Sequence, residues 1–230
     1  FILALGYKAE KIKDYFINYD ERVSNDFVYT LGGNRIEMLN TDIDDWKITF
    51  VDTGMKSNVG MRLMRLRKLL EGEEMFLANY ADGLSDIHLP EVIHQFKSQP
   101  DKVASLVSYR PTGSFHLVES NNSGLITSIA PIANTKLSLN VGYFCLRPEI
   151  FDYMNYGEEL VEAPLQRLID EKKLITYQHD GFWQSMDTFK DKMLLDDMNN
   201  AGSPPWEVWN QDRNDSWRQR DEETDSNPAL

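Results

Sequence analysis

The sequence is short of positive charge. It carries 24 lysine and arginine residues against 37 aspartate and glutamate residues, which gives a formal net charge of −13 at pH 7. Nucleic acids and anionic membrane surfaces attract clustered lysine and arginine side chains. We therefore expect no nucleic acid and no membrane among the partners. An acidic protein can still bind phosphate groups locally, through a metal ion or through backbone amides.

Cysteine and long apolar runs are also scarce. The single cysteine, Cys145, excludes an internal disulfide framework, and its apolar context "VGYFCLRP" favours a buried, unreactive thiol over a reactive one. No run approaches the roughly 20 apolar residues that span a bilayer, and no secretory signal is recognisable. We expect a cytoplasmic protein. Because the chain opens at Phe1, inside a predicted strand, we also expect it to be a fragment.

Strand and helix patterns alternate along the 230 residues, of which 41% are hydrophobic. Such a chain can bury a sizeable core, and the alternation predicts an α/β fold with a mixed, mostly parallel sheet covered by helices on both faces. We expect one domain over 1–210 and a polar, disordered tail over 211–230. Strand patterns lie at 1–7, 46–54, 75–82, 102–111, 138–147 and 174–187. Helix patterns lie at 8–19, 59–72, 89–99, 163–173 and 188–202, and a further helix is predicted to start near Pro148. A hairpin is predicted at 115–132.

Two aspartates follow predicted strands. Asp82 ends the apolar run of "MFLANYADG" between the small residues Ala81 and Gly83, and Asp187 follows "GFWQSM". Ligands of open α/β sheets sit at the carboxyl ends of strands, and one or two carboxylates with phosphate oxygens suit Mg²⁺. The two aspartates could therefore share one magnesium ion. Asp82 could equally cap the following turn, which is a common role of aspartate after a strand.

Two further segments each admit two interpretations. The segment "DTGMKSNVGMRL" (52–63) places Gly54, Gly60 and Arg62 before a helix, where backbone amides could cradle a phosphate, but it lacks a phosphate-loop signature and could be an ordinary loop. Trp183 and Gln184 beside Asp187 could form a sugar-binding wall, or an aromatic edge of the core. The four histidines have no metal-ligand spacing, and we interpret them as surface or structural residues.

Several segments together resemble the sugar-nucleotide pyrophosphorylases, and most closely the glucose-1-phosphate cytidylyltransferase branch of these nucleotidyltransferases. In chain order they are "LGYKAEKIKDYF", "ITFVDTG", "VGMRLMRL", "NYADGLSD", "NVGYFCLRPEIFDYM", the run from "APLQRLID" to "MLLDDM", and "PPWEVW". The resemblance covers residues 1 to 210. It implies a three-layer Rossmann-like fold that lacks the first strand–loop–helix unit of the family.

The resemblance also implies a reaction and its residues. A sugar 1-phosphate attacks the α-phosphate of a nucleoside triphosphate, here CTP and glucose 1-phosphate, and the products are CDP-glucose and pyrophosphate for surface-polysaccharide (lipopolysaccharide O-antigen) synthesis. The implied cofactor is Mg²⁺, and the implied assembly is a homo-oligomer. Asp82 and Asp187 become the metal-binding and catalytic residues. The other implied residues are Ser57, Gly60, Arg62 and Ala81 (with Asp82) for the nucleotide, and Asn140, Gly142, Trp183 and Gln184 for the sugar.

Several motifs of the family are altered. The glycine-rich triphosphate loop is missing, the phosphate-binding lysine of the E-K-P motif falls on "API" (130–132), and G-R-F-G reads "GSFH" (113–116). T-G-G-R has become "VGMR" (59–62), and Ala163 replaces a glutamate. Three hypotheses follow: a divergent nucleotidyltransferase, which both aspartates favour; a non-catalytic sugar-phosphate-binding or regulatory relative, which the lost cations favour; and an interaction protein that uses its acidic tail.

Overall fold

The computed structural model describes residues 1–111 and 116–209, so the predicted tail over 211–230 lies outside the described residues. The chain divides into two compact units. The first comprises 1–72 and 151–167, and the second comprises 73–150 and the residues from 168 onward. No helix of the described residues is both long enough and apolar enough to cross a membrane.

The predicted alternation of strands and helices is confirmed, with shorter elements than the patterns suggested. The α-helices are α1 (Ala9–Ile17), α2 (Glu21–Ser24), α3 (Val59–Leu66), α4 (Leu89–Lys97), α5 (Ala163–Asp170) and α6 (Phe189–Asn200). The strands are β1 (Ile2–Leu5), β2 (Phe27–Thr30), β3 (Arg35–Met38), β4 (Thr49–Asp52), β5 (Phe76–Asn79), β6 (Gly83–Ser85), β7 (Ala104–Tyr109), β8 (His116–Ser120), β9 (Ile126–Pro131), β10 (Leu139–Leu146), β11 (Leu174–His179) and β12 (Trp183–Ser185). Short 3₁₀ turns occur at Leu31–Gly33, Arg67–Leu69, Ile132–Asn134 and Pro148–Tyr153.

The first unit contains a parallel pair of strands, β1 and β4, followed by helix α3. The Asn58 side chain caps α3 by accepting a 2.8 Å hydrogen bond from the Met61 amide, as an N-terminal asparagine commonly does. Leu63 and Leu66 form the buried face of the helix. The hairpin β2–β3 was not predicted, although its strands flank a Gly-Gly turn that is a recognisable hairpin signal.

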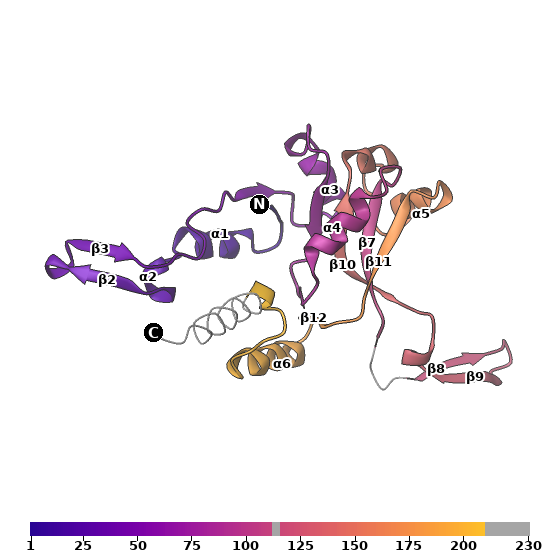
Figure 1. Cartoon of the computed structure of the whole chain (residues 1–230). Coiled ribbons are helices and arrows are strands. Elements are labelled where there is room, and N and C mark those ends of the chain that lie inside the picture. Colours follow the sequence, from indigo (N-terminus) through magenta and orange to yellow (C-terminus); the bar gives the residue numbers. More distant parts are fainter. Residues whose placement is uncertain (112–115, 210–230) are drawn as a thin grey trace, which may run out of the picture. The chain divides into compact units, whose positions relative to one another are not determined.

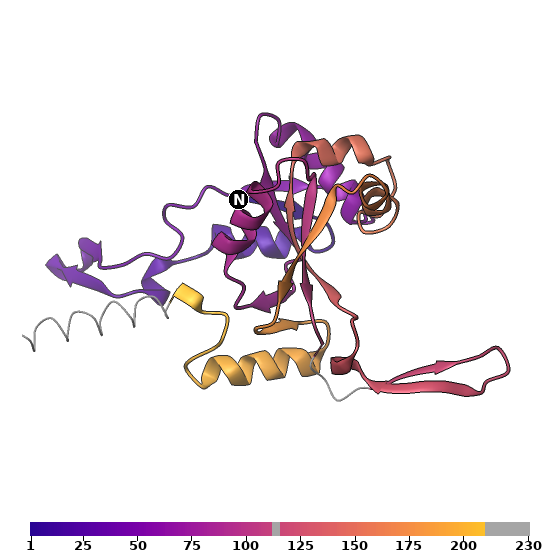
Figure 2. The same cartoon turned by 45° about the vertical axis from the view of Figure 1, so that its right-hand side comes forward.

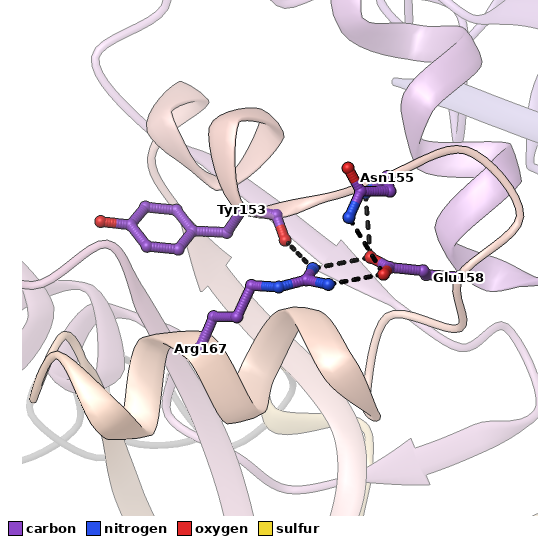
Figure 3. A network of polar contacts seen from close by, with 4 residues as sticks. All are labelled: Tyr153, Asn155, Glu158 and Arg167. Carbon is purple, nitrogen blue, oxygen red and sulfur yellow. Dashed lines mark hydrogen bonds and ion pairs between the residues drawn. The ribbon is translucent and has the colours of Figure 1, made fainter.

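A polar network ties 153–167 of the first unit together (Figure 3). The Arg167 guanidinium makes two hydrogen bonds to the Glu158 carboxylate, at 2.7 and 2.6 Å, and a third to the Tyr153 carbonyl at 2.7 Å. Asn155 donates to the same carboxylate from its backbone and its side chain. Arg167, followed by the Asn155 donors, lowers the pKa of Glu158 to about 2. The carboxylate is therefore held ionised by hydrogen bonds from four N–H groups.

The second unit is built on a four-stranded sheet in the order β11–β7–β10–β5. β7 and β11 are parallel, whereas β10 runs antiparallel to both of its neighbours. Helix α4 packs against β7 and β10 (Figure 1), because Val92 and Phe96 project from one face of the helix into the core. The buried cluster between the helix and the sheet consists of Ile87, Val92, Phe96, Val107, Val141 and Cys145.

Two antiparallel ladders complete the second unit. β6 pairs with β12, which leads into helix α6, and β8 pairs with β9 in the hairpin predicted at 115–132 (Figure 2). The hairpin turns at residues 121–124, where the Asn121 side chain accepts hydrogen bonds from the amides of Ser123 and Leu125. The short β6–β12 ladder carries the residues on which the functional argument depends.

The mixed α/β class is confirmed, but the prediction of one mostly parallel sheet is not. The described strands form separate sheets, and parallel pairing is limited to β1–β4 and β7–β11. Parallel neighbours need a long crossover, usually a helix. The described part of the connection from β7 to β10 contains a hairpin and a 3₁₀ turn instead, and β10 returns antiparallel. The helix predicted from Pro148 is a 3₁₀ segment ending at Tyr153.

Candidate active site

The β6–β12 ladder brings Asp82 and Asp187 to the same end of two paired strands. Its register joins Gly83 to Ser185, so Asp82 and Met186 are the next residues outward on each strand. The Met186 amide donates a 2.7 Å hydrogen bond to the Asp82 carbonyl oxygen, which extends the pairing by one step. Asp187 follows directly. The two aspartates singled out from the sequence therefore lie next to one another across the ladder, at the level of the backbone.

The side chains of the two aspartates are both exposed but differ in their contacts. The Asp187 carboxylate accepts a 2.8 Å hydrogen bond from the Ser185 hydroxyl, which restricts its rotation. Among the described residues, none donates a hydrogen bond to the Asp82 carboxylate or forms an ion pair with it. Within the described residues, no lysine or arginine forms an ion pair with Asp82 or Asp187. The Asp82 carboxylate oxygens are therefore available to a ligand.

Strand β10 supports the ladder from the neighbouring sheet through Tyr143. The Tyr143 hydroxyl donates a 2.8 Å hydrogen bond to the Gly83 carbonyl oxygen, immediately after Asp82. Burial, followed by the negative charge of Asp82, raises the pKa of Tyr143. The phenol therefore remains a hydrogen-bond donor beyond the pH at which a free tyrosine ionises.

The predicted sugar residues Asn140 and Gly142 lie in the same strand. The Asn140 side chain accepts a 3.0 Å hydrogen bond from the Gly142 amide, at an irregularity in the pairing of β10 with β7. Gly142 has a φ of 77°, and a Cβ atom there would lie 2.4 Å from the ring of Tyr80. The glycine is thus required by its backbone conformation and by the close approach of Tyr80. The roles of Asn140 and Gly142 toward a sugar stay predictions.

Trp183 and Gln184, the other predicted sugar residues, have contacts within the protein. Trp183 packs against the buried cluster and lies 5.7 Å, between ring centroids, from Tyr109. Its indole N–H is buried without a hydrogen-bond partner among the described residues. Gln184 donates a 2.8 Å hydrogen bond to the Ser185 carbonyl. The packing of Trp183 agrees with the alternative interpretation as an aromatic edge of the core.

The predicted nucleotide residues Ser57, Gly60 and Arg62 belong to the first unit, whereas Ala81, which is exposed beside Asp82, belongs to the second. Arg62 donates hydrogen bonds to the Thr53 hydroxyl at 2.9 Å and the Ala4 carbonyl at 3.3 Å. The Ser57 hydroxyl donates to the Thr53 carbonyl. The Arg62 contacts link α3 to β1 and to the end of β4, and the Ser57 contact closes the loop after β4. Both side chains thus have a structural role. Their contact with a nucleotide stays a prediction.

Gly60 also has a structural explanation. A Cβ atom at this position would lie 2.2 Å from the Glu158 backbone carbonyl oxygen, so the loop at residue 158 packs directly on the first turn of α3. Any larger residue would force helix and loop apart. From the sequence alone, Gly60 could belong to a phosphate-binding loop or to an ordinary loop, and its nucleotide role came from the resemblance to the family. The packing partner at residue 158 is remote in the chain and gives no local signal.

The other motif residues fall as follows. Ala130 lies in β9 and Ala163 begins α5, while Gly113 and its two successors lie outside the described residues. The predicted burial of Cys145 is confirmed, and burial raises the pKa of its thiol to about 11. Tyr143, and Asp86 at the other end of β6, were not among the candidate residues identified from the sequence. His179 was interpreted only as a surface or structural histidine.

The donor set fits a magnesium ion and does not form a complete protein cage. Asp82 and Asp187 lie at the same end of the ladder with exposed side chains, and carboxylate oxygens are donors that Mg²⁺ prefers, together with phosphate and water oxygens. Within residues 1–111 and 116–209, no group of three or more His, Cys, Asp or Glu side chains is placed to hold a metal. An ion held by two carboxylates would thus require further ligands from a substrate or from water.

Known proteins resemble the chain over most of its length. The glucose-1-phosphate cytidylyltransferase of Salmonella typhimurium is 32% identical over 210 residues, which cover 91% of this chain and 81% of that protein. The probable glucose-1-phosphate cytidylyltransferase of Bacillus subtilis is 33% identical over 213 residues, with the same coverage of 91% and 81%. The chain belongs to the sugar nucleotidyltransferase family. No family model matches the sequence.

Two solved structures resemble the chain in fold. HddC from Yersinia pseudotuberculosis superposes with a TM-score of 0.52 at 15% identity, over 84% of this chain and 75% of that one. UDP-glucose pyrophosphorylase from Acinetobacter baumannii gives a TM-score of 0.50 at 14% identity, over 73% and 66% of the two chains. At such low identity the likeness concerns the fold alone. The family assignment therefore rests on the two cytidylyltransferase relatives.

Proposed function

We propose that the protein is a sugar-1-phosphate nucleotidyltransferase that joins CTP and glucose 1-phosphate to form CDP-glucose and pyrophosphate. The relatives at 32% and 33% identity carry that activity in their names, which supports the choice of substrates. The observation that carries the proposal is the β6–β12 ladder, because its hydrogen bond from Met186 to Asp82 sets Asp82 beside the start of the segment that bears Asp187.

The proposed reaction needs positioning and charge neutralisation rather than a covalent intermediate on the protein. A phosphate oxygen of glucose 1-phosphate attacks the α-phosphorus of CTP. A new phosphorus–oxygen bond forms, the bond to the bridging oxygen of the β-phosphate breaks, and pyrophosphate leaves with that electron pair. No proton has to be taken from the attacking phosphate, which is already ionised at neutral pH. A general base is therefore not required.

The chain's own residues would hold the reacting groups. Asp82 and Asp187 would hold Mg²⁺, which when bound reduces the repulsion between the phosphates of the two substrates. Tyr143 fixes the backbone directly after Asp82, and Ser185 orients the Asp187 carboxylate. The proposed sugar side is the segment from Asn140 to Gly142. A net charge of −13 makes such local neutralisation necessary before two phosphorylated substrates can meet at the protein.

Release of pyrophosphate tests this proposal directly. Purified protein is incubated with glucose 1-phosphate, Mg²⁺ and each of CTP, UTP, dTTP and ATP in turn, and the nucleotide sugar is identified by mass. We expect CDP-glucose and pyrophosphate in equal amounts with CTP, and their loss when Mg²⁺ is chelated. Asp82→Asn should abolish the release, whereas Asp197→Asn, an exposed carboxylate of α6, should not change it. A wild-type rate in Asp82→Asn would contradict the proposed role of Asp82.

One observation favours a second candidate, a non-catalytic relative that binds sugar phosphate or nucleotide. Residues 130–132, on which the family's phosphate-binding lysine is expected to fall, read "API" and contain no lysine or arginine. A charged hydrogen bond of this kind contributes about 1.5–3 kcal/mol. Saturable binding of glucose 1-phosphate or CTP without any release of pyrophosphate would favour this candidate over the enzyme.

A further inference from the structure

A histidine–carboxylate pair lies at the opposite end of the ladder from Asp82 and Asp187. The Nε2 atom of His179, the last residue of β11, lies 2.9 Å from an oxygen of Asp86. His179 is only 8% exposed, and the Asp86 side chain is 30% exposed. The same histidine nitrogen lies 3.0 Å from the Phe182 carbonyl oxygen. Because both neighbours of Nε2 are hydrogen-bond acceptors, Nε2 carries a proton and donates to them.

Asp86 and His179 together close the turn that connects β11 to β12. The Asp86 carboxylate also accepts a 2.7 Å hydrogen bond from the Phe182 amide, and the Asp86 amide donates to the Phe182 carbonyl at 3.2 Å. Gly181 is packed between the two side chains, since a Cβ atom there would lie 2.4 Å from the Asp86 carboxylate and 2.8 Å from the His179 ring. The turn therefore has one closely fitted conformation.

This turn determines where the ladder starts. Among the described strands, β6 and β12 form a sheet of their own, separate from the four-stranded sheet that contains β11. Polar contacts join the ladder to that sheet at both ends: the hydrogen bond from Tyr143 to the Gly83 carbonyl at one, and the pair of His179 with Asp86 at the other. Trp183 adds an apolar contact at the His179 end by packing beside Tyr109.

We propose that Asp86 and His179 are positioning residues, which hold the β6–β12 ladder so that Asp82 and Asp187 can bind one metal ion together. The inference rests on the proposed function of these two aspartates. Asp86 belongs to the same short strand segment as Asp82, and His179 precedes the segment that ends in Asp187. When the pair is broken, β12 can shift relative to β6, and the two carboxylates no longer meet at one point. Neither positioning residue needs to touch a substrate.

Calorimetric titration of the full chain with Mn²⁺ alone separates a positioning role from a purely structural role. His179→Leu removes the donor, and His179→Gln retains an N–H group near the position of Nε2. His88→Leu is the matched control, since His88 is an exposed histidine of the same unit that also neighbours a carboxylate, Glu91, at 3.4 Å. Loss of groups that orient metal ligands commonly weakens binding by about 10–100-fold. We expect at least about tenfold weaker Mn²⁺ binding in His179→Leu, substantial recovery in His179→Gln, and no change in His88→Leu.

The variants are compared at a temperature where each is shown by circular dichroism to be folded. If His179→Leu does not fold, Asp86→Ala takes its place, because alanine removes the carboxylate that accepts from His179 and from the Phe182 amide. Wild-type Mn²⁺ affinity in a folded His179→Leu or Asp86→Ala protein, alongside weakened binding in Asp82→Asn, would overturn the positioning role and leave the proposed metal site intact. If the wild-type protein binds no Mn²⁺, the proposed metal site fails first, and the positioning role fails with it.

Discussion

The amide of Met186 donates a 2.7 Å hydrogen bond to the carbonyl oxygen of Asp82, and this contact joins two distant parts of the sequence. Because Met186 pairs with Asp82, the residue that follows Met186, Asp187, lies directly after the pairing partner of Asp82. These are the two exposed carboxylates to which the proposed function assigns a shared Mg²⁺.

Tyr143→Phe should weaken the support of the ladder next to Asp82. The substitution leaves the Gly83 carbonyl without its 2.8 Å donor, and the loss of such a hydrogen bond costs about 0.5–1.5 kcal/mol. We expect a lower midpoint of urea unfolding at pH 7 and weaker metal binding. An unchanged midpoint and unchanged metal affinity would show that the hydroxyl does not support the ladder.

The same hydroxyl predicts a change of stability in alkaline solution. Burial and then the charge of Asp82 raise the pKa of Tyr143 in the folded protein, so the folded state holds this proton more tightly than the unfolded state. The resulting stabilisation is complete below the unfolded pKa near 10 and is lost as the pH rises through the folded value. The wild-type protein should therefore lose stability faster than Tyr143→Phe above pH 10, as measured by urea unfolding. Parallel losses would contradict the assignment.

Gly60→Ala should destabilise the first unit. The new Cβ atom would lie 2.2 Å from the Glu158 backbone carbonyl oxygen, which cannot rotate away as a side chain could. Overpacking of this kind costs about 1–3 kcal/mol, which exceeds the roughly 1 kcal/mol that alanine gains over glycine in a helix. Thermal unfolding should show a lower midpoint, with Arg65→Ala, an exposed position of the same helix, as the control. A raised midpoint would contradict the packing role of Gly60.

Arg167→Gln should reduce stability at neutral pH and much less in acid. Hydrogen bonds from Arg167, followed by those from Asn155, lower the pKa of Glu158 from 4.5 to about 2 in the folded protein. The stabilisation is therefore present above pH 4.5 and is lost as the pH falls toward 2. Unfolding midpoints of wild type and variant should converge over this range.

The control for this prediction is Arg35→Gln. Arg35 and Glu37 form a surface pair whose side chains are 67% and 62% exposed, and such pairs contribute little to stability. We expect a small difference from wild type at every pH. A difference between wild type and Arg167→Gln that is equally large at pH 2 and pH 7 would exclude the carboxylate of Glu158 as the cause.

The main elements of the fold could be predicted from periodicity, and their pairing could not. Leucines at helical spacing predicted α3, and the apolar run around Val107 predicted β7. The ladder escaped prediction because β6 and β12 contain three residues each, too few to show a period. The antiparallel return of β10 likewise depends on which connection contains a helix, and this is a property of the whole chain.

In the candidate site, too, local features could be predicted from the sequence and long-range contacts could not. A carboxylate directly after an apolar strand is a local signal that made Asp82 a candidate, but it left a turn-capping role open, and the metal role rested on the resemblance to the family. Asp86, His179 and Tyr143 gave no such signal, because each acts through a partner distant in sequence. Gly60 and Arg62 matched a family motif, and the contacts that explain them are with the Glu158 carbonyl and with Thr53.

The central claim is that Asp82 and Asp187 hold one metal ion. Its most direct test measures Mn²⁺ binding by electron paramagnetic resonance in the wild-type protein, Asp82→Asn, Asp187→Asn and the double variant. If both carboxylates hold one ion, each single variant should lose at least about tenfold in affinity, a factor that corresponds to about 1.4 kcal/mol. The double variant should then retain no specific site, while Asp197→Asn should bind as wild type. Wild-type affinity in either single variant would contradict the claim that Asp82 and Asp187 form one metal site.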